Sequence, residues 1–252
     1  MQAKHKAACS TPLWAALLAA ATLAGAPALA ADVKVRDGDP GFRTDLGVHL
    51  AVGGHSCVAG GTGYASCTGT DNSWDTSWGL AGGLIVRPFS RVSVGVDVAY
   101  LNMISHQETD NTWSDLLLGP IVRYHQPLHL GSIYTEPSLG VQGGYVWGIW
   151  HLNKSNSTAV TGDNEHLGGF LAIVLGWDVF LLPRLGVGIE LRLVRTFYQE
   201  VCFHWDGKDL CRGVDDRSIV TQPSSTANFP ADPGAADYPW KLFYGVHGIY
   251  YF

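Results

Sequence analysis

Charged residues and long apolar runs are both scarce in this chain of 252 residues. Only 15% of the residues are charged, against 46% apolar and 31 glycines, which is unusual for a soluble enzyme. After residue 30, no stretch approaches the ~18 consecutive apolar residues of a transmembrane helix. If the mature chain enters a membrane, it must therefore do so with strands.

Basic residues are also few. The first 30 residues contain two lysines, Lys4 and Lys6, and no acidic residue, so 14 basic and 22 acidic residues remain after them, a net charge of −8. A chain with this balance lacks the basic surface that nucleic acid requires. We therefore expect no nucleic-acid partner.

Residues 1–30 have the layout of a secretory signal peptide. Lys4 and Lys6 form a basic start, residues 13–24 form an apolar middle, and Ala28-Leu29-Ala30 forms a small-residue cleavage site. The apolar middle is too short to span a membrane. We expect cleavage after Ala30, which leaves residues 31–41 as a short polar lead.

Large apolar residues alternate with small or polar ones in eight later segments. In residues 42–53, for example, every second residue from Phe42 to Val52 is large and apolar except Thr44, and the residues between them are small or polar. The other segments lie near residues 74–86, 92–100, 115–125, 133–150, 166–178, 185–193 and 240–252. Segments of about ten residues suit tilted strands that cross a bilayer. The pattern predicts an all-β fold, an eight-stranded antiparallel up-and-down transmembrane β-barrel over residues 42–252.

The connections between these segments alternate in length. Residues 87–90, 126–131 and 181–184 form short turns, whereas residues 54–73, 104–112, 151–164 and 199–239 form longer loops. Outer-membrane barrels place short turns in the periplasm and long loops outside. The loop at 199–239 is the longest, so it is the best candidate to contact a surface partner.

Alternation alone does not decide whether the apolar face points outward, because a lipocalin-like soluble barrel has the same pattern with an apolar interior. Three features favour the membrane. Aromatic residues gather near both strand ends, glycine and alanine dominate the polar face, and the strands are long. A surface facing water would carry more lysine and glutamate.

The last strand ends in an alternating series, Tyr244, Val246, Gly248, Tyr250 and Phe252. This series resembles the C-terminal signature of outer-membrane barrels. With the eight segments, residues 42–252 resemble small bacterial outer-membrane barrels of the OmpA/OmpX type. The resemblance implies the outer membrane as location, its lipid and lipopolysaccharide as surroundings and the barrel assembly machinery as a partner, with Tyr250 and Phe252 as the assembly signal.

The polar face carries ionisable residues well inside the strands: His49, Asp97, Arg123, Glu136, Glu190, Arg192 and His247. Eight strands leave an interior that side chains can fill. We expect these groups to pair across it and close the lumen, with Arg123 and Glu136 opposite each other around a turn near residue 129. A gated proton or ion path through the same residues is the alternative.

Four cysteines after residue 30 form two close pairs, Cys57 with Cys67 and Cys202 with Cys211. An oxidising compartment favours a disulfide within each pair. The first and last loops are neighbours in a closed barrel, so pairing between loops stays open.

Catalysis would need a nucleophile, a histidine base and an acid that converge on the outer rim. Histidines 106, 151, 166 and 204 lie in or beside the predicted outer loops, but no recognised spacing links them, and no lipid A deacylase or palmitoyltransferase motif is present. No catalytic, cofactor-binding or metal-binding residue is predicted. We expect a structural or surface-interaction role, with a passive channel for small hydrophobic molecules as the first alternative and a lipid A-modifying enzyme as the second.

Overall fold

A computed structural model describes residues 45–59, 77–104, 112–131, 133–152, 162–205, 208–213, 220–221, 228–229 and 240–252. The predicted signal peptide (1–30) and lead (31–41) lie outside these residues. The strands are β1 (Asp45–Ala59), β2 (Ser77–Phe89), β3 (Val92–Ile104), β4 (Thr112–His125), β5 (Leu128–Leu130), β6 (Ile133–Leu152), β7 (Gly162–Leu182), β8 (Leu185–Trp205), β9 (Lys208–Gly213), β10 (Val220–Thr221), β11 (Asn228–Phe229) and β12 (Trp240–Tyr251). Among the described residues, no helix is long and apolar enough to cross a membrane.

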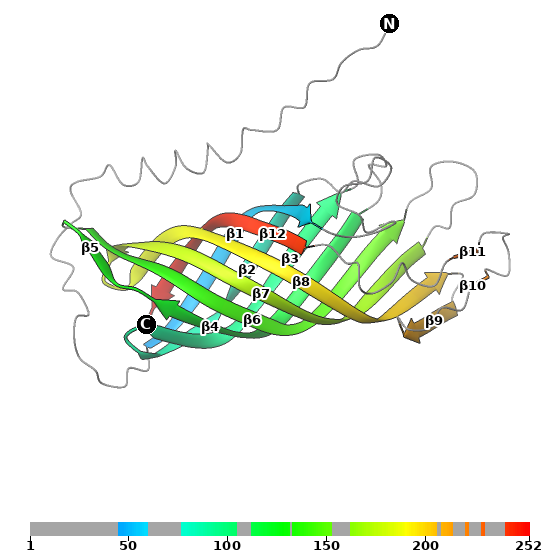
Figure 1. The fold of residues 1–252 in the computed structure, drawn as a ribbon, viewed down its shortest axis with the longest axis horizontal. Coiled ribbons are helices and arrows are strands. Elements are labelled where there is room, and N and C mark those ends of the chain that lie inside the picture. Colours follow the sequence, from blue (N-terminus) through cyan, green and yellow to red (C-terminus); the bar gives the residue numbers. More distant parts are fainter. Residues whose placement is uncertain are drawn as a thin grey trace, which may run out of the picture.

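Eight of the strands form a closed antiparallel ring (Figure 1). They follow each other in the order β1, β2, β3, β4, β6, β7, β8 and β12, and β12 then pairs with β1. At this seam Gly47 lies opposite Tyr251, and the pairing runs to Ala59 opposite Trp240. The predicted eight-stranded up-and-down barrel is confirmed.

The strand ends joined by short connections lie at one end of the barrel, here called the turn end, and the strand ends that lead into the longer connections lie at the other, the loop end. Strands β6, β7 and β8 have 20, 21 and 21 residues and reach further toward the loop end than the sequence predicted. The segment predicted to be irregular from residue 199 starts as the end of β8, which continues to Trp205 and pairs with β9. The prediction failed here because the apolar alternation fades after residue 193, although the backbone pairing continues.

A disulfide joins Cys202 to Cys211, which lie opposite each other in the β8–β9 hairpin. Cys57 also takes part in a disulfide. Cys67, its predicted partner, lies outside the described residues.

The hairpin between β4 and β6 has a different register from the predicted one. Strand β5 pairs with the start of β6, with Leu130 opposite Ile133, so the chain reverses between these two residues and not near residue 129. Gly131 has a φ of 65°, in the left-handed region that glycine adopts readily. Arg123 therefore lies opposite Gly140 and not opposite Glu136. The predicted register was wrong because residues 126–131, including Pro127, were assigned to the turn. In the structure, residues 128–130 after Pro127 still pair with β6.

The outside of the barrel is apolar. Each strand of the ring exposes at least one large aliphatic side chain, here Leu50, Leu84, Val96, Leu118, Val141, Leu171, Leu191 and Val246. The alternate positions point inward and are buried. The direction of the apolar face, which alternation alone left open, is therefore outward, as the membrane interpretation required.

The interior is layered along the axis. One apolar cluster lies toward the loop end and includes Leu101, Met103, Trp113 and Phe243. A second lies toward the turn end and includes Ile85, Ile121, Phe180, Ile249 and Tyr251. On β12, His247 lies between Phe243 of the first cluster and Ile249 of the second. These large apolar side chains were not predicted, because the inward face was interpreted as small and polar throughout.

Candidate functional site

The seven ionisable residues predicted to face the lumen are all buried inside the barrel: His49, Asp97, Arg123, Glu136, Glu190, Arg192 and His247. They come from β1, β3, β4, β6, β8 and β12, where the alternation turns each of them inward. The structure divides them into two groups, which we call the central layer and the turn-end group.

The central layer is built on Asp97 and Glu190. Nη2 of Arg123 lies 2.9 Å from Oε2 of Glu190, and it approaches Oδ2 of Asp97 at 3.7 Å. Arg192 contacts both carboxylates, with Nη2 at 2.9 Å from Oδ2 of Asp97 and Nε at 2.5 Å from Oε1 of Glu190. It also donates through Nη1 to Oε1 of Gln142 at 3.0 Å. Strands β3, β4, β6 and β8 are thus linked through the interior.

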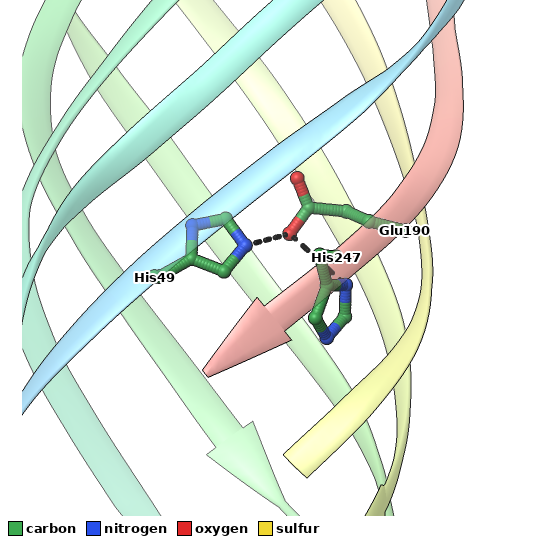
Figure 2. A group of neighbouring side chains, drawn as sticks. All are labelled: His49, Glu190 and His247. Atoms are coloured by element: carbon green, nitrogen blue, oxygen red, sulfur yellow. Dashed lines mark ion pairs between the residues drawn. The ribbon is translucent and has the colours of Figure 1, made fainter. Parts of the chain in front are cut away.

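Two histidines complete the central layer (Figure 2). Nε2 of His49 lies 3.1 Å from Oε2 of Glu190, and its Nδ1 lies 3.6 Å from Oδ2 of Asp97. Nδ1 of His247 lies 3.9 Å from the same oxygen of Glu190, and its Nε2 lies 2.5 Å from Oδ1 of Asp178. The two rings meet edge to face, with centres 5.2 Å apart.

Glu136 belongs to the turn-end group and not to the central layer. Nη1 of Arg87 lies 2.9 Å from Oε2 of Glu136, and Tyr134 donates its hydroxyl hydrogen to the same carboxylate. The guanidinium of Arg87 also lies 5.9 Å from the centre of the Tyr251 ring. The predicted pairing of Arg123 with Glu136 was wrong, because the shifted hairpin register brings Glu136 to Arg87 and leaves Arg123 to Glu190.

Ser93, His125 and Glu136 form a row inside the turn-end group. The Ser93 hydroxyl and Nε2 of His125 are hydrogen-bonded at 2.8 Å, and Nδ1 of His125 lies 3.7 Å from Oε2 of Glu136. This order is that of a hydrolytic triad. All three side chains are buried inside the barrel, however, and the carboxylate already binds Arg87. In the described residues the hydroxyl is therefore exposed neither to the membrane nor to water.

A third interior group, near the loop end, was missed by the sequence analysis. Lys241 pairs with Asp115, whose Oδ1 accepts hydrogen bonds from Tyr198 at 2.6 Å and from Trp113 at 2.8 Å. His166, which was assigned to the outer rim, is buried with its ring 5.6 Å from that of Trp113. The alternation predicted that Asp115 points inward. It did not predict Lys241 as the partner of Asp115, because Lys241 is the second residue of β12, where the alternation has only begun.

The proposed assembly signal lies at the turn end. Tyr250 and Phe252 are exposed on the outside, and their ring centres are 5.2 Å apart. The backbone amide of Phe252 donates to the carbonyl of Leu46 at 2.9 Å, which extends the seam by one residue. Phe252 therefore contributes backbone pairing and an outward ring rather than interior packing.

No protein-family profile and no curated protein sequence matches the chain. Similar solved structures include the outer membrane protein OprG from Pseudomonas aeruginosa, 10% identical over 83% of this chain and 97% of that one, with a TM-score of 0.49. A major outer membrane protein from Thermus thermophilus is 15% identical over 83% and 99%, with a TM-score of 0.48. Neisserial surface protein A is 10% identical over 86% and 100%, with a TM-score of 0.45.

The surfaces of this chain themselves indicate a membrane environment. Every strand of the ring is hydrogen-bonded on both sides, the exterior is apolar and the interior holds the charges. Lipid excludes any spanning structure that leaves backbone groups unpaired, and a closed barrel meets this condition. The chain therefore forms a small closed β-barrel with the surfaces of a membrane-spanning barrel.

Proposed function

We propose that the barrel has a closed lumen and serves a structural or surface-interaction role in the outer membrane. The observation that carries this proposal is the central layer, in which Arg123 and Arg192 reach Asp97 and Glu190 from strands on different sides of the interior. Charges this deeply buried are expensive to separate. Apolar clusters lie on both sides of the layer. A filled interior of this kind supports a barrel that does not conduct.

The loop end supports the interaction part of the proposal. A tilted strand needs about 9–11 residues to cross a bilayer, and β6, β7 and β8 are about twice as long. Their surplus length extends beyond the loop end of β1, β2 and β3, which have 15, 13 and 13 residues. The disulfide between Cys202 and Cys211 braces the tip of β8. This side of the barrel offers a rigid, raised surface to a partner outside the cell.

Two further interactions are part of the proposal. The apolar exterior is surrounded by outer-membrane lipid and lipopolysaccharide. The barrel assembly machinery recognises the last strand through Tyr250 and Phe252, which are both exposed on the outside.

Planar-bilayer recordings with the purified protein test the closed lumen. We expect only rare, small events from the wild-type barrel, whereas a 16-stranded porin recorded in the same lipid gives steady currents. Steady, large, voltage-independent currents from the wild-type barrel would refute the proposal in favour of a channel. Faster uptake of a small apolar dye into vesicles that contain the barrel, compared with empty vesicles, would favour the passive hydrophobic channel instead.

A further inference from the structure

We propose that His49, Glu190 and His247 form a binding site for a transition-metal dication such as Zn²⁺ inside the barrel. The three residues lie on β1, β8 and β12, which are neighbours around the seam. One ligand atom from each residue lies within 4.8 Å of the other two. Figure 2 shows both imidazole rings beside the Glu190 carboxylate. This site is independent of whether the lumen conducts.

The atoms that would bind the metal have no hydrogen-bond partner among the described residues. Nε2 of His49, Nδ1 of His247 and Oε2 of Glu190 are all buried and make no hydrogen bond. His49 and Glu190 approach each other at 3.1 Å, but without the direction that a hydrogen bond needs. Buried polar atoms are rarely left in this state, and a bound ion is one common reason. Oε2 of Glu190 is ion-paired with Arg123 at 2.9 Å, so the two imidazole nitrogens that converge on it are the atoms that point to a shared ligand.

A carboxylate lies behind each histidine ring, and the one behind the ring of His247 is hydrogen-bonded to it. Nε2 of His247 lies 2.5 Å from Oδ1 of Asp178, on the side of the ring away from its free Nδ1. Nδ1 of His49 lies 3.6 Å from Oδ2 of Asp97, again on the side away from Nε2. A carboxylate that is hydrogen-bonded to one ring nitrogen keeps the hydrogen on that nitrogen. The lone pair of the other ring nitrogen is then free to bind a metal. This arrangement occurs on His247, whereas Nδ1 of His49 makes no hydrogen bond with Asp97.

The charges of the central layer leave room for a cation. Three carboxylates, those of Asp97, Asp178 and Glu190, lie in the interior with the two guanidinium groups of Arg123 and Arg192, so the carboxylates exceed the guanidinium groups by one. Arg123 contacts the same oxygen of Glu190 that would bind the metal. On binding, we expect Arg123 to move toward Asp97, which it already approaches at 3.7 Å.

The donor set selects the class of metal. Two imidazole nitrogens and one carboxylate oxygen suit Zn²⁺ and its transition-metal neighbours, whereas Mg²⁺ and Ca²⁺ require oxygen ligands. The other convergent group, Glu200 with Cys202 and Cys211, is not a candidate, because both sulfurs are engaged in the disulfide. A metal at the seam would tie the first strand of the barrel to its last two ring strands.

Refolding in the presence of metal tests the site without depending on access through a closed lumen. The full-length barrel is unfolded with a chelator and refolded into detergent with Zn²⁺ or with the chelator retained. After desalting, we expect one zinc per folded chain in the first sample, together with a higher unfolding temperature than in the second. A folded wild-type barrel that retains no zinc would overturn the proposal.

Variants distinguish this site from another buried histidine of the barrel, His125. We expect His49→Gln and His247→Gln to lose the bound zinc, and Asp178→Asn to weaken binding by about 10- to 100-fold, the usual effect of losing a partner behind a metal ligand. His125→Gln, which changes another buried histidine, should bind zinc like the wild type. Wild-type affinity in both His49→Gln and His247→Gln would refute the assignment.

Cobalt gives a direct readout that does not depend on stability. In His49→Cys refolded with Co²⁺, a thiolate ligand should add a sulfur-to-cobalt charge-transfer band that the wild-type complex lacks. The band would appear only if residue 49 contacts the metal. Its absence in a folded, cobalt-loaded His49→Cys barrel would place the metal elsewhere and overturn the proposal, even if His49→Gln fails to fold.

Discussion

Arg123 and Glu190 are ion-paired at 2.9 Å although their strands, β4 and β8, are not neighbours in the ring. Glu190 is also the carboxylate that Arg192 and His49 contact. A single side chain therefore connects residues from β1, β4 and β8. The stability of the central layer should depend on it more than on any peripheral charge.

Glu190→Gln is expected to lower the free energy of unfolding by about 3–5 kcal/mol, the usual cost of leaving buried charges unpaired. Urea unfolding in detergent or lipid measures this. Glu200→Gln is the matched control, because Glu200 lies on the same strand but is exposed, and should change stability by less than ~0.5 kcal/mol. Equal effects from the two variants would contradict the central role of Glu190.

The register of the β4–β6 hairpin can be tested by double-mutant cycles. Arg87 and Glu136 are in direct contact, so their coupling energy should fall in the range of about 0.5–3 kcal/mol found for contacting residues. Arg123 and Glu136 belong to different groups and should be additive to within about 0.3–0.5 kcal/mol. A larger coupling for Arg123 with Glu136 would restore the pairing that the sequence suggested.

Ser93 should be unreactive in the folded barrel despite its hydrogen bond to His125. A fluorophosphonate probe that labels accessible, activated serines should leave it unmodified in detergent and in lipid vesicles, since its side chain is buried. Mass spectrometry of the labelled protein provides the measurement. Stoichiometric labelling of Ser93 that disappears in His125→Ala would instead identify a hydrolase.

Deletion of Phe252 is expected to reduce assembly more than final stability. The residue is 61% exposed, so its loss removes little interior packing, while the terminal signature is disrupted. Surface labelling in cells should show a lower inserted fraction, and material refolded in vitro should unfold near the wild-type temperature. Normal surface levels of a chain that ends at Tyr251 would count against the assembly signal.

Non-reducing peptide mapping should recover Cys202 linked to Cys211 and Cys57 linked to Cys67. The double substitution Cys202→Ser with Cys211→Ser should make the β8–β9 hairpin more sensitive to proteases than the rest of the barrel. By the chain-entropy relation, a ring of this size contributes about 2–3 kcal/mol. A peptide that joins Cys57 to Cys202 or Cys211 would refute local pairing.

Alternation was sufficient to predict the ring and to place residues such as Asp97 and His247 on one face, whereas the outward direction of the apolar face needed the aromatic residues at the strand ends and the strand length as well. The ring and the shared face follow from the period of two, which places every second side chain on one face. The ion-pair partner of each charged residue was harder to predict. It depends on register across several strands, and one misplaced reversal, at Gly131, reassigned both Arg123 and Glu136.

Two other features were beyond a strand-by-strand interpretation. Large inward residues such as Met103 and Phe243 interrupt the small and polar face, because a filled barrel needs apolar packing as well as ion pairs. The convergence of His49, Glu190 and His247 has no signature in spacing, because the three residues come from strands far apart in the sequence that meet only when the ring closes.

Because the first strand of the ring, β1, pairs with the last, β12, the barrel cannot close before the whole chain is present. In chain order Asp97 and Arg123 belong to β3 and β4, Glu190 and Arg192 belong to β8, and the ring closes only when β12 pairs with β1. Until then the nascent sheet carries uncompensated charges on one face and two unpaired edges, neither of which lipid tolerates. Intermediates should therefore remain hydrated or chaperoned, and release into the bilayer should follow the arrival of the final strand, with a rate limited by this most distant pairing in the chain.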